Sequence, residues 1–505
     1  MRKTACLGIL LTAVLAVGYS LEPHEVPTPK AWSSQSLVGY RIPLAGLGRP
    51  PELISEHDYY ALPESNVKTY PVYTPEKEPA GYIDWLKNQD PQPLVEVTKL
   101  KTPADWLAAG RGVFYGRELP RYTGSEDNLQ LIRNPKVLEA YRLQTTGEGV
   151  LLGLRYVVRQ KGKVELGTDT CAMCHVQVRH GSIVEGPPNN STPFGPLMAD
   201  LTRRYAQVSP AFFEQRRRQQ MREDYRVPYL KNDPNLAVAD LPPDQIADLY
   251  ARVPLGAYMR TNTSLLYPVK IANLVGVKDL AYFDRTGTAR QRDITDLMRY
   301  IASIADVTDA LTVYGDGDGD GGRLKPQNLG LTSGVHRTPD PMLYALAMFV
   351  YSLAPPKNPN AFDDGARAGQ RVFQQNCARC HVPPLYTSNK LTLAKGFEPT
   401  DEERKQLNLL DVSVGTDPGL ALQTRKGTGF YRVPSLRMLW TNVCFLHDGS
   451  IGSLEEMFDP QRLQPTFRSS NWSATTPSRA VAGHPFGLGL SASDRTALIK
   501  FLRTL

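Results

Sequence analysis

Two pentapeptides combine a pair of cysteines with a histidine: Cys171-Ala172-Met173-Cys174-His175 and Cys377-Ala378-Arg379-Cys380-His381. In a Cys-x-x-Cys-His motif the two thiols add to the vinyl groups of a haem, and the histidine binds the iron. A redox-active or zinc-binding cysteine pair is the alternative, but two such motifs in a chain with six cysteines favour haem. The sequence therefore predicts two covalently bound haem c groups, haem 1 on Cys171, Cys174 and His175, and haem 2 on Cys377, Cys380 and His381.

An internal repeat indicates which helices position these motifs. Ala368–Phe373 (AGQRVF) leads into the second motif, and a near copy, Ala109–Phe114 (AGRGVF), lies upstream of the first. In a cytochrome c fold this helix crosses the domain's last helix, with glycine allowing the close approach and phenylalanine filling the contact. The expected partners are the helix that begins at Ser491 and, in the first unit, the segment Leu343 to Leu353.

These elements predict a mainly α fold with two cytochrome c-type haem domains in tandem. Domain 1 covers residues 101–356 and domain 2 covers 357–505. Domain 1 carries an insertion in which residues 149–166 alternate like a small β-hairpin. Residues 19–100 are rich in proline and tyrosine and are expected to form an irregular N-terminal arm around the domains.

The start of the chain has the features of a signal peptide. Arg2 and Lys3 precede an apolar run from Ala5 to Val17, so residues 1–18 are expected to direct export, with an uncleaved anchor as the weaker alternative. No later run is long enough to cross a bilayer, so no stable span is expected in the mature chain. The net charge of +7 is too small and dispersed to favour nucleic acid. The expected location is periplasmic or secreted.

The segments after the second motif resemble a known family. Tyr431–Trp440, Phe445–Ser450 and Leu454–Met457 contain R-x-P-S-L-R, F-x-H-D-G-S and Leu-Glu-Glu patterns. These are similar to the bacterial di-haem cytochrome c peroxidase superfamily, which also contains MauG and the haem-dependent rubber oxygenases. The resemblance covers residues 101–505 and is weaker in domain 1. There, Leu274–Asp279 and Tyr282–Gly287 take the equivalent places, and the His-Asp-Gly is lost.

The resemblance implies roles around haem 2. His447 is expected to support a propionate of haem 2 rather than to bind iron. In domain 1, which would supply the pocket, Arg285 is a candidate to pair with a haem propionate. The sixth ligand of the haem 2 iron is His484 or Met457. Peroxidases of this family use a methionine somewhat further downstream, where this chain has Gln461, whereas the rubber-oxygenase branch uses a histidine. We therefore favour His484 and regard Met457 as a core residue.

Haem 1 is the expected catalytic group because no second ligand is evident for its iron. His180 lies too close to the motif in sequence, and His336, before the domain's last helix, is more readily a loop residue. An iron that lacks a strong second ligand can bind peroxide or dioxygen. Tyr282 and Phe283 are the candidate catalytic residues of this pocket, with core packing as the alternative.

Two features of the family's peroxidases cannot be located in the sequence. No motif singles out a proton-shuttling glutamate, for which Glu185, Glu214 and Glu223 are candidates. No tryptophan occurs between Trp106 and Trp440, so an interhaem tryptophan would have to come from elsewhere.

A glycine-rich acidic run lies between the domains. Asp316, Asp318 and Asp320 alternate with glycine, like the first half of an EF-hand loop, but Gln327 stands where the bidentate glutamate belongs. A calcium site is one interpretation, and a flexible acidic loop is the other.

The sequence thus predicts an exported haem-dependent oxidoreductase that activates peroxide or dioxygen at haem 1. Haem 2 would relay electrons from a small redox protein or a quinol-linked donor. A di-haem electron carrier without catalysis is the main alternative. A dioxygenase that acts on an apolar substrate, as the rubber oxygenases do, is another.

Overall fold

The computed structural model describes residues 28–117, 119–124, 133–179, 181–214, 218–259, 263–305, 311–314, 336–471 and 481–505. The expected signal peptide (1–18), His180 and the aspartate run at 316–320 lie outside these residues, and so does the side chain of Glu223. Among the described residues no helix is long and apolar enough to cross a membrane.

Helices are the main regular structure, in agreement with the predicted fold class. The α-helices are α1 (Ser34–Leu37), α2 (Glu56–Ala61), α3 (Tyr82–Lys87), α4 (Pro103–Gly116), α6 (Pro135–Ala140), α7 (Cys171–Cys174), α8 (Phe194–Val208), α9 (Pro210–Phe212), α10 (Arg218–Tyr225), α11 (Pro243–Ala251), α12 (Ile294–Ala305), α14 (Asp340–Ser352), α15 (Asp364–Asn376), α16 (Asp401–Gln406), α17 (Gly419–Leu422), α18 (Leu454–Met457) and α19 (Ala492–Arg503). Short 3₁₀ helices are η1 (Val97–Lys99), η3 (Leu236–Asp240), η4 (Val277–Asp279), η5 (Leu439–Thr441) and η6 (Pro460–Leu463).

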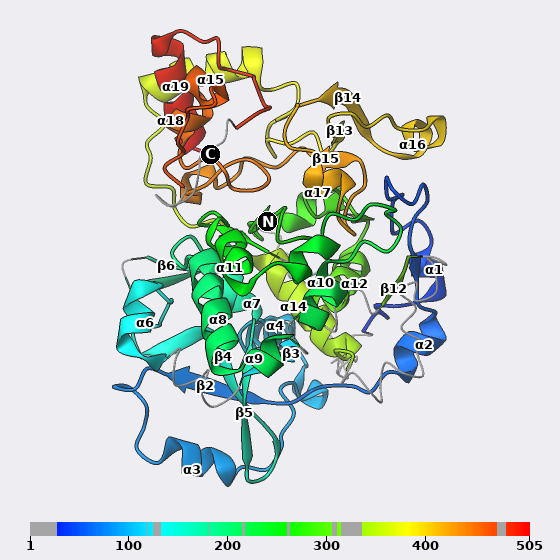
Figure 1. Cartoon of the computed structure of the whole chain (residues 1–505), viewed down its shortest axis with the longest axis vertical. Helices are drawn as coiled ribbons and strands as arrows, with labels where there is room; N and C mark the ends of the chain where they lie inside the picture. The colour runs from blue at the N-terminus through cyan, green and yellow to red at the C-terminus, as the bar shows by residue number, and fades with distance from the viewer. Residues whose placement is uncertain are drawn as a thin grey trace, which may run out of the picture.

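The strands form small, separate sheets. They are β1 (Glu52–Leu53), β2 (Thr69–Tyr73), β3 (Leu119–Gly124), β4 (Val150–Gln160), β5 (Lys163–Thr168), β6 (Val176–Arg179), β7 (Ser182–Glu185), β8 (Ala257–Tyr258), β9 (Val269–Lys270), β10 (Tyr282–Phe283), β11 (Ala289–Arg290), β12 (Thr312–Val313), β13 (Leu391–Leu393), β14 (Leu409–Ser413) and β15 (Phe430–Arg432). In Figure 1 the last helices, α15, α18 and α19, form the upper end of the molecule, with β13–β15 beside them.

The first helix of the repeat, α4, packs on α14 through a glycine. A Cβ atom added to Gly110 would lie 2.0 Å from the carbonyl oxygen of Ala345, so only glycine permits this approach. One turn further on, Phe114 and Phe349 pack with their ring centroids 5.3 Å apart.

The second unit repeats this crossing between α15 and α19. A Cβ on Gly369 would lie 1.9 Å from the carbonyl oxygen of Ala497, and the Phe373 and Phe501 rings lie 5.2 Å apart. The two helix crossings predicted from the repeated sequence are therefore both present, with the same residue types at each contact.

The predicted β-hairpin is confirmed and belongs to a larger sheet. β4 and β5 pair antiparallel up to Gln160 and Lys163, and Gly162, at φ +88°, lies in the connecting turn. The sheet has the order β2-β4-β5-β3, so β2 from the N-terminal arm joins the hairpin.

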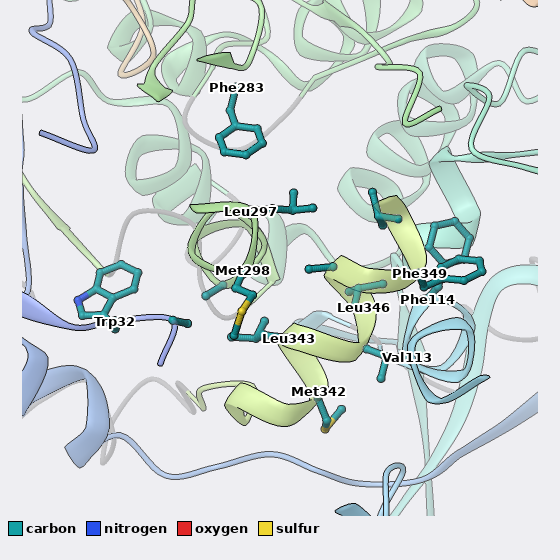
Figure 2. Close-up of a cluster of buried hydrophobic side chains, with 14 of the residues drawn as sticks. Trp32, Val113, Phe114, Phe283, Leu297, Met298, Met342, Leu343, Leu346 and Phe349 are labelled. Atoms are coloured by element: carbon teal, nitrogen blue, oxygen red, sulfur yellow. The ribbon is translucent and has the colours of Figure 1, made fainter. Parts of the chain in front are cut away.

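The N-terminal arm is less irregular than predicted and contributes to the core. It contains α1–α3 and β1–β2, and its Trp32, Tyr40 and Tyr59 are fully buried. Figure 2 shows Trp32 in the same cluster as side chains of α4, α12 and α14. Arg299 of α12, paired with Asp296 at 2.5 Å, also stacks on the ring of Tyr40 at 4.6 Å. Buried aromatic anchors therefore fix a segment that its composition indicates to be loose.

Candidate functional site

The first motif forms one helical turn, α7, which His175 ends. The Nδ1 of His175 lies 3.0 Å from the carbonyl oxygen of Ala272. A carbonyl only accepts, so Nδ1 carries the proton and Nε2 has the lone pair that a metal requires. Burial raises the pKa of the Cys171 thiol to about 11, so the free thiol would be protonated at neutral pH.

The second motif has the same arrangement. His381 Nδ1 lies 3.2 Å from the carbonyl oxygens of both Tyr386 and Pro434. Burial raises the pKa of Cys377 to about 11 and lowers that of His381, which favours the neutral imidazole. Each proximal histidine is thus anchored through the nitrogen that iron would not use.

A cavity of about 340 Å³ opens beside the second motif. This volume is in the range of ligand pockets. Its walls are mostly apolar, and Cys377, Cys380 and His381 line one part of it. Other lining residues include Leu436, Leu439, Phe445, Leu454, Met457, Phe458, His484 and Leu502.

His484 lies across the cavity from His381. Their ring centroids are 6.5 Å apart, with the rings tilted by 49°. An imidazole nitrogen binds a metal at about 2.0–2.1 Å, so two imidazoles on opposite sides of one ion have ring centres roughly 6.3 Å apart. Burial, followed by the proximity of His381, lowers the pKa of His484 to about 4, which keeps it neutral. The separation of the two rings would therefore suit the binding of a single iron by both imidazoles.

The other residues predicted around haem 2 lie in or beside this cavity. His447 lines it, with Thr416 Oγ1 3.3 Å from its Nδ1 and Tyr431 Oη 3.4 Å from its Nε2. Met457 lines it too, as a buried residue of the core cluster that includes Phe373.

In the described part of the chain five cations line this cavity, namely Lys270, Arg285, Arg379, Arg432 and Arg437. Burial lowers the pKa of three of them, of which only Arg285 was predicted. Lys270 and Arg432 are the other two, and their pKa values fall to about 8 and about 10. None of the three forms an ion pair with a carboxylate in the described part of the chain, and Nη1 of Arg432 is buried without a hydrogen bond. Half-buried cations without carboxylates favour an anionic ligand, and haem propionates have this chemistry.

The repeat explains where the two unpredicted cations come from. Residues 269–289 and 431–451 have the same backbone course. Gly276 and Met438 both adopt positive φ before a 3₁₀ turn, and Asp284 and Leu446 do so ahead of a glycine in the same conformation. In this alignment Lys270 matches Arg432. A search for identical residues misses such pairs because the residue types differ.

Reciprocal hydrogen bonds join these two segments. The backbone N–H of Lys270 donates to the carbonyl of His447, and that of Arg432 donates to the carbonyl of Arg285, both at 2.8 Å. Lys270 matches Arg432, and His447 matches Arg285, so each bond is the counterpart of the other. The two segments therefore meet about a local pseudo-two-fold axis, beside which the cavity lies.

Two asparagines repeat this pattern. Asn190 Nδ2 donates to the carbonyl oxygen of Thr441 at 2.5 Å, and Asn389 Nδ2 donates to that of Asp279 at 2.8 Å. Asp279 and Thr441 occupy matching ends of η4 and η5.

The two candidate catalytic residues point to different surroundings. Phe283 packs in the cluster that contains Ala172 of the first motif, and it stacks on Tyr300 with ring centroids 4.6 Å apart. Tyr282 belongs to another cluster, with Leu391, and its oxygen accepts from the N–H of Asn408 at 3.1 Å. The structure thus brings Phe283, but not Tyr282, into the core around the first motif.

The other candidates near haem 1 have varied environments. Glu185 Oε1 accepts from Arg111 Nε and Tyr115 Oη, both at 2.7 Å, whereas Glu214 is exposed. His336 is half-buried just before α14. In the described ranges no cluster of histidine, cysteine, aspartate and glutamate suits a bare metal ion.

Both tryptophans considered in the sequence have defined places. Trp106 is buried at the α4–α14 crossing and packs on Tyr344. Trp440 lies under the guanidinium of Arg179, which is four residues after His175. The guanidinium carbon is 4.7 Å from the centroid of the Trp440 ring.

Comparisons with known proteins add little. No protein-family model and no curated protein matches the chain. Among solved structures, hydrazine synthase of Kuenenia stuttgartiensis is 15% identical over 47% of this chain and 73% of its own, with a TM-score of 0.27. A MauG-like protein associated with microbial copper homeostasis is 18% identical over 33% of this chain and 56% of its own, with a TM-score of 0.22. Likeness at this level carries no argument, so the functional conclusion depends on the residues.

Proposed function

We propose that this chain is an exported di-haem c-type oxidoreductase. In this proposal the chain would activate peroxide or dioxygen at haem 1 and relay electrons through haem 2. The observation that carries the proposal is the second site, where an Nδ1-anchored His381 faces His484 across a cavity that cations also line. The first motif has the same anchored histidine, which supports a second haem.

At the second site each group has a distinct task. Cys377 and Cys380 would hold the haem by thioether bonds, and His381 and His484 would bind its iron. Arg285 and His447, with the cations beside them, neutralise the propionates. A haem with two strong ligands transfers single electrons and excludes small oxidants. Met457 would then be a core residue.

At the first site Cys171, Cys174 and His175 hold the haem from one side. Phe445 lines the second cavity, and Phe283 is its counterpart in the repeat, which supports Phe283 as the proposed cover of haem 1. Tyr282 is retained as a candidate with a weaker argument, because it packs elsewhere. An apolar cover and an open iron position would admit a small oxidant and exclude bulk water.

In this proposal two cytochrome c domains, 101–356 and 357–505, each carry one haem and meet at the pseudo-two-fold contacts. The electron donor would be a small redox protein or a quinol-linked protein in the periplasm. Calcium at Asp316, Asp318 and Asp320 lies outside the described residues and has no structural support.

A carrier of electrons without catalysis is the second candidate. The His381–His484 pair is what such a carrier needs, and His336, placed before α14 as His484 is before α19, would have to complete haem 1.

The test is low-temperature EPR of the full-length, haem-loaded protein, oxidised and half-reduced, before and after hydrogen peroxide. We expect one low-spin and one high-spin ferric signal, with peroxide altering only the high-spin signal. Two low-spin signals indifferent to peroxide in both redox states would leave the electron carrier.

Variants assign the signals. His484→Ala should convert the low-spin haem to high-spin, whereas the control His57→Ala, on a side chain 90% exposed, should change neither. Protein that carries no covalent haem after expression with a c-type maturation system would overturn the whole proposal.

A further inference from the structure

Arg462 is a fully buried arginine without a carboxylate partner in the described chain. It lies in η6 at 0% exposure, and burial lowers its pKa. Within the described residues, its side-chain hydrogen bonds go to backbone carbonyls, so peptide dipoles neutralise its charge there. Burying a guanidinium costs free energy unless hydrogen bonds or an ion pair replace its hydration.

The four carbonyls that it binds belong to the two segments that carry the candidate iron ligands. Nε donates to the carbonyl of Met457 at 3.0 Å, and Nη1 donates to that of Val481 at 2.7 Å. Nη2 donates to the carbonyls of Gly483 and His484 at 2.9 and 2.8 Å. One rigid planar group thus fixes the distance between the Met457 segment and the His484 loop.

The His484 loop needs this support because its backbone is disfavoured. His484 has φ +46°, in the left-handed region that residues other than glycine adopt uncommonly. Gly483 beside it has φ +86°, and a Cβ there would lie 2.3 Å from the nitrogen of Thr416. The N–H of His484 donates to the carbonyl of Val414 at 2.6 Å. Backbone bonds on both sides of His484 therefore aim its ring at the cavity.

We propose that Arg462 is a positioning residue that selects His484 over Met457 as the sixth ligand of haem 2. The inference rests on the proposed function, since it requires a haem at the second site. The guanidinium acts through the backbone: it fixes the position of the Met457 carbonyl and holds the His484 loop in its uncommon conformation. Without it, the loop relaxes and the methionine segment is released.

The test compares Arg462→Gln with Arg468→Gln in the full-length, haem-loaded chain. Arg468 is a matched control because it is exposed, lies on the same segment and also donates only to carbonyls. We expect Arg462→Gln to lose the bis-histidine low-spin EPR signal of haem 2, giving a high-spin or methionine-ligated species. Added imidazole should restore a low-spin signal in the high-spin species. The midpoint potential of haem 2 should rise if methionine replaces histidine. Arg468→Gln should match the wild type.

A second variant keeps the inference testable if Arg462→Gln does not accumulate. In His484→Ala, Arg462 still fixes the Met457 carbonyl, so haem 2 should become high-spin and stay free of methionine ligation. Methionine ligation in that variant, or an unchanged spectrum and potential in Arg462→Gln, would overturn the role of Arg462. A wild-type chain that holds no haem, or no bis-histidine haem, would instead be a failure of the proposed function.

Discussion

At the scale of single residues, function here depends on atoms that do not touch the cofactor. His175 and His381 donate Nδ1–H to backbone carbonyls, and these carbonyls belong to Ala272 and Pro434, which match in the repeat. Sequence reasoning identified the ligands, because the spacing of the motif dictates them. It could not identify the carbonyls, which carry no side-chain signature.

Lys270 provides a test of the cation group. Replacing it with methionine keeps the length of the side chain and removes a positive charge beside the proposed propionates of haem 2. The oxidised haem, which carries one more positive charge, should become easier to form. Its midpoint potential should therefore fall. The lost interaction between the two charges is on the order of 1–2 kcal/mol at an effective dielectric constant of about 20.

The measurement for this variant is a spectroelectrochemical titration of the haem-loaded chain. Lys278→Met is the matched control, because Lys278 is exposed on the neighbouring η4 turn. Equal potentials in the Lys270→Met variant and the wild type would show that Lys270 does not act on the haem.

Asp169 predicts a pH dependence of stability. Burial raises its pKa from 3.8 to about 6, so between these values the folded chain binds a proton that the unfolded chain has released. Stability should therefore fall as the pH rises from 3.8 to 6, and the buried carboxylate should cost on the order of 3 kcal/mol at neutral pH.

Asp169→Asn should remove this loss, since asparagine tolerates the φ of +60° found there. Urea unfolding at pH 4.5 and pH 7 would show it: the variant should gain stability mainly at pH 7. A gain of the same size at both pH values would mean that the carboxyl does not titrate in this range.

At the scale of elements, the sequence predicted what repeats and missed what only folding brings together. The glycine and phenylalanine of α4 recur in α15, so both helix crossings could be predicted from type and spacing. The β4–β5 hairpin followed from alternation and a glycine turn. The sequence did not predict that β2 joins this hairpin, or that Trp32 enters the core, because neither pairing leaves a local pattern.

The α15–α19 crossing gives a prediction with an internal control. In Gly369→Ala the added carbon would lie 1.9 Å from a backbone oxygen, so the helices must separate. We expect a loss of about 1–3 kcal/mol or more in the free energy of unfolding. Gly112→Ala, on the exposed face of α4 with nothing within 4 Å, should instead gain about 0.5–1 kcal/mol.

Denaturant titration of the haem-loaded variants would measure both changes. A Gly369→Ala variant as stable as Gly112→Ala would show that α15 and α19 do not approach so closely.

At the scale of the whole molecule, the two repeated segments make reciprocal contacts beside the cavity. The sequence placed Arg285 and His447 in equivalent segments, yet their pairing with Lys270 and Arg432 across the axis needed the structure. The repeat is hard to recognise in domain 1 because Lys270 there matches Arg432, and Arg285 matches His447. What is kept between the halves is the backbone conformation, including the positive φ at Asp284 and Leu446.

The buried ion pair of Asp284 and Lys426 joins two distant segments of the chain near the cavity, so we expect its loss to lower the free energy of unfolding strongly. Their side chains are 9% and 8% exposed and 2.6 Å apart, and Asp284 also accepts from Tyr300 Oη at 2.7 Å. Asp284→Asn would take this carboxylate away from the buried ammonium of Lys426, so it would no longer offset the cost of desolvating that charge. We expect a loss of about 3–5 kcal/mol in the free energy of unfolding.

Lys426→Met should cost less than Asp284→Asn, because the carboxylate it leaves retains Tyr300 and Thr288 as donors. The fully exposed Asp364 supplies the control Asp364→Asn, which should stay within about 0.5 kcal/mol of the wild type. Guanidinium chloride titration of the haem-loaded proteins measures all three. The comparison of Asp284→Asn with Lys426→Met tests whether positive charge is in excess here. If Lys426→Met lost more stability, the carboxylate and not the cation would be the charge in excess. The interface would then lack the surplus of positive charge that makes propionates its fitting ligands.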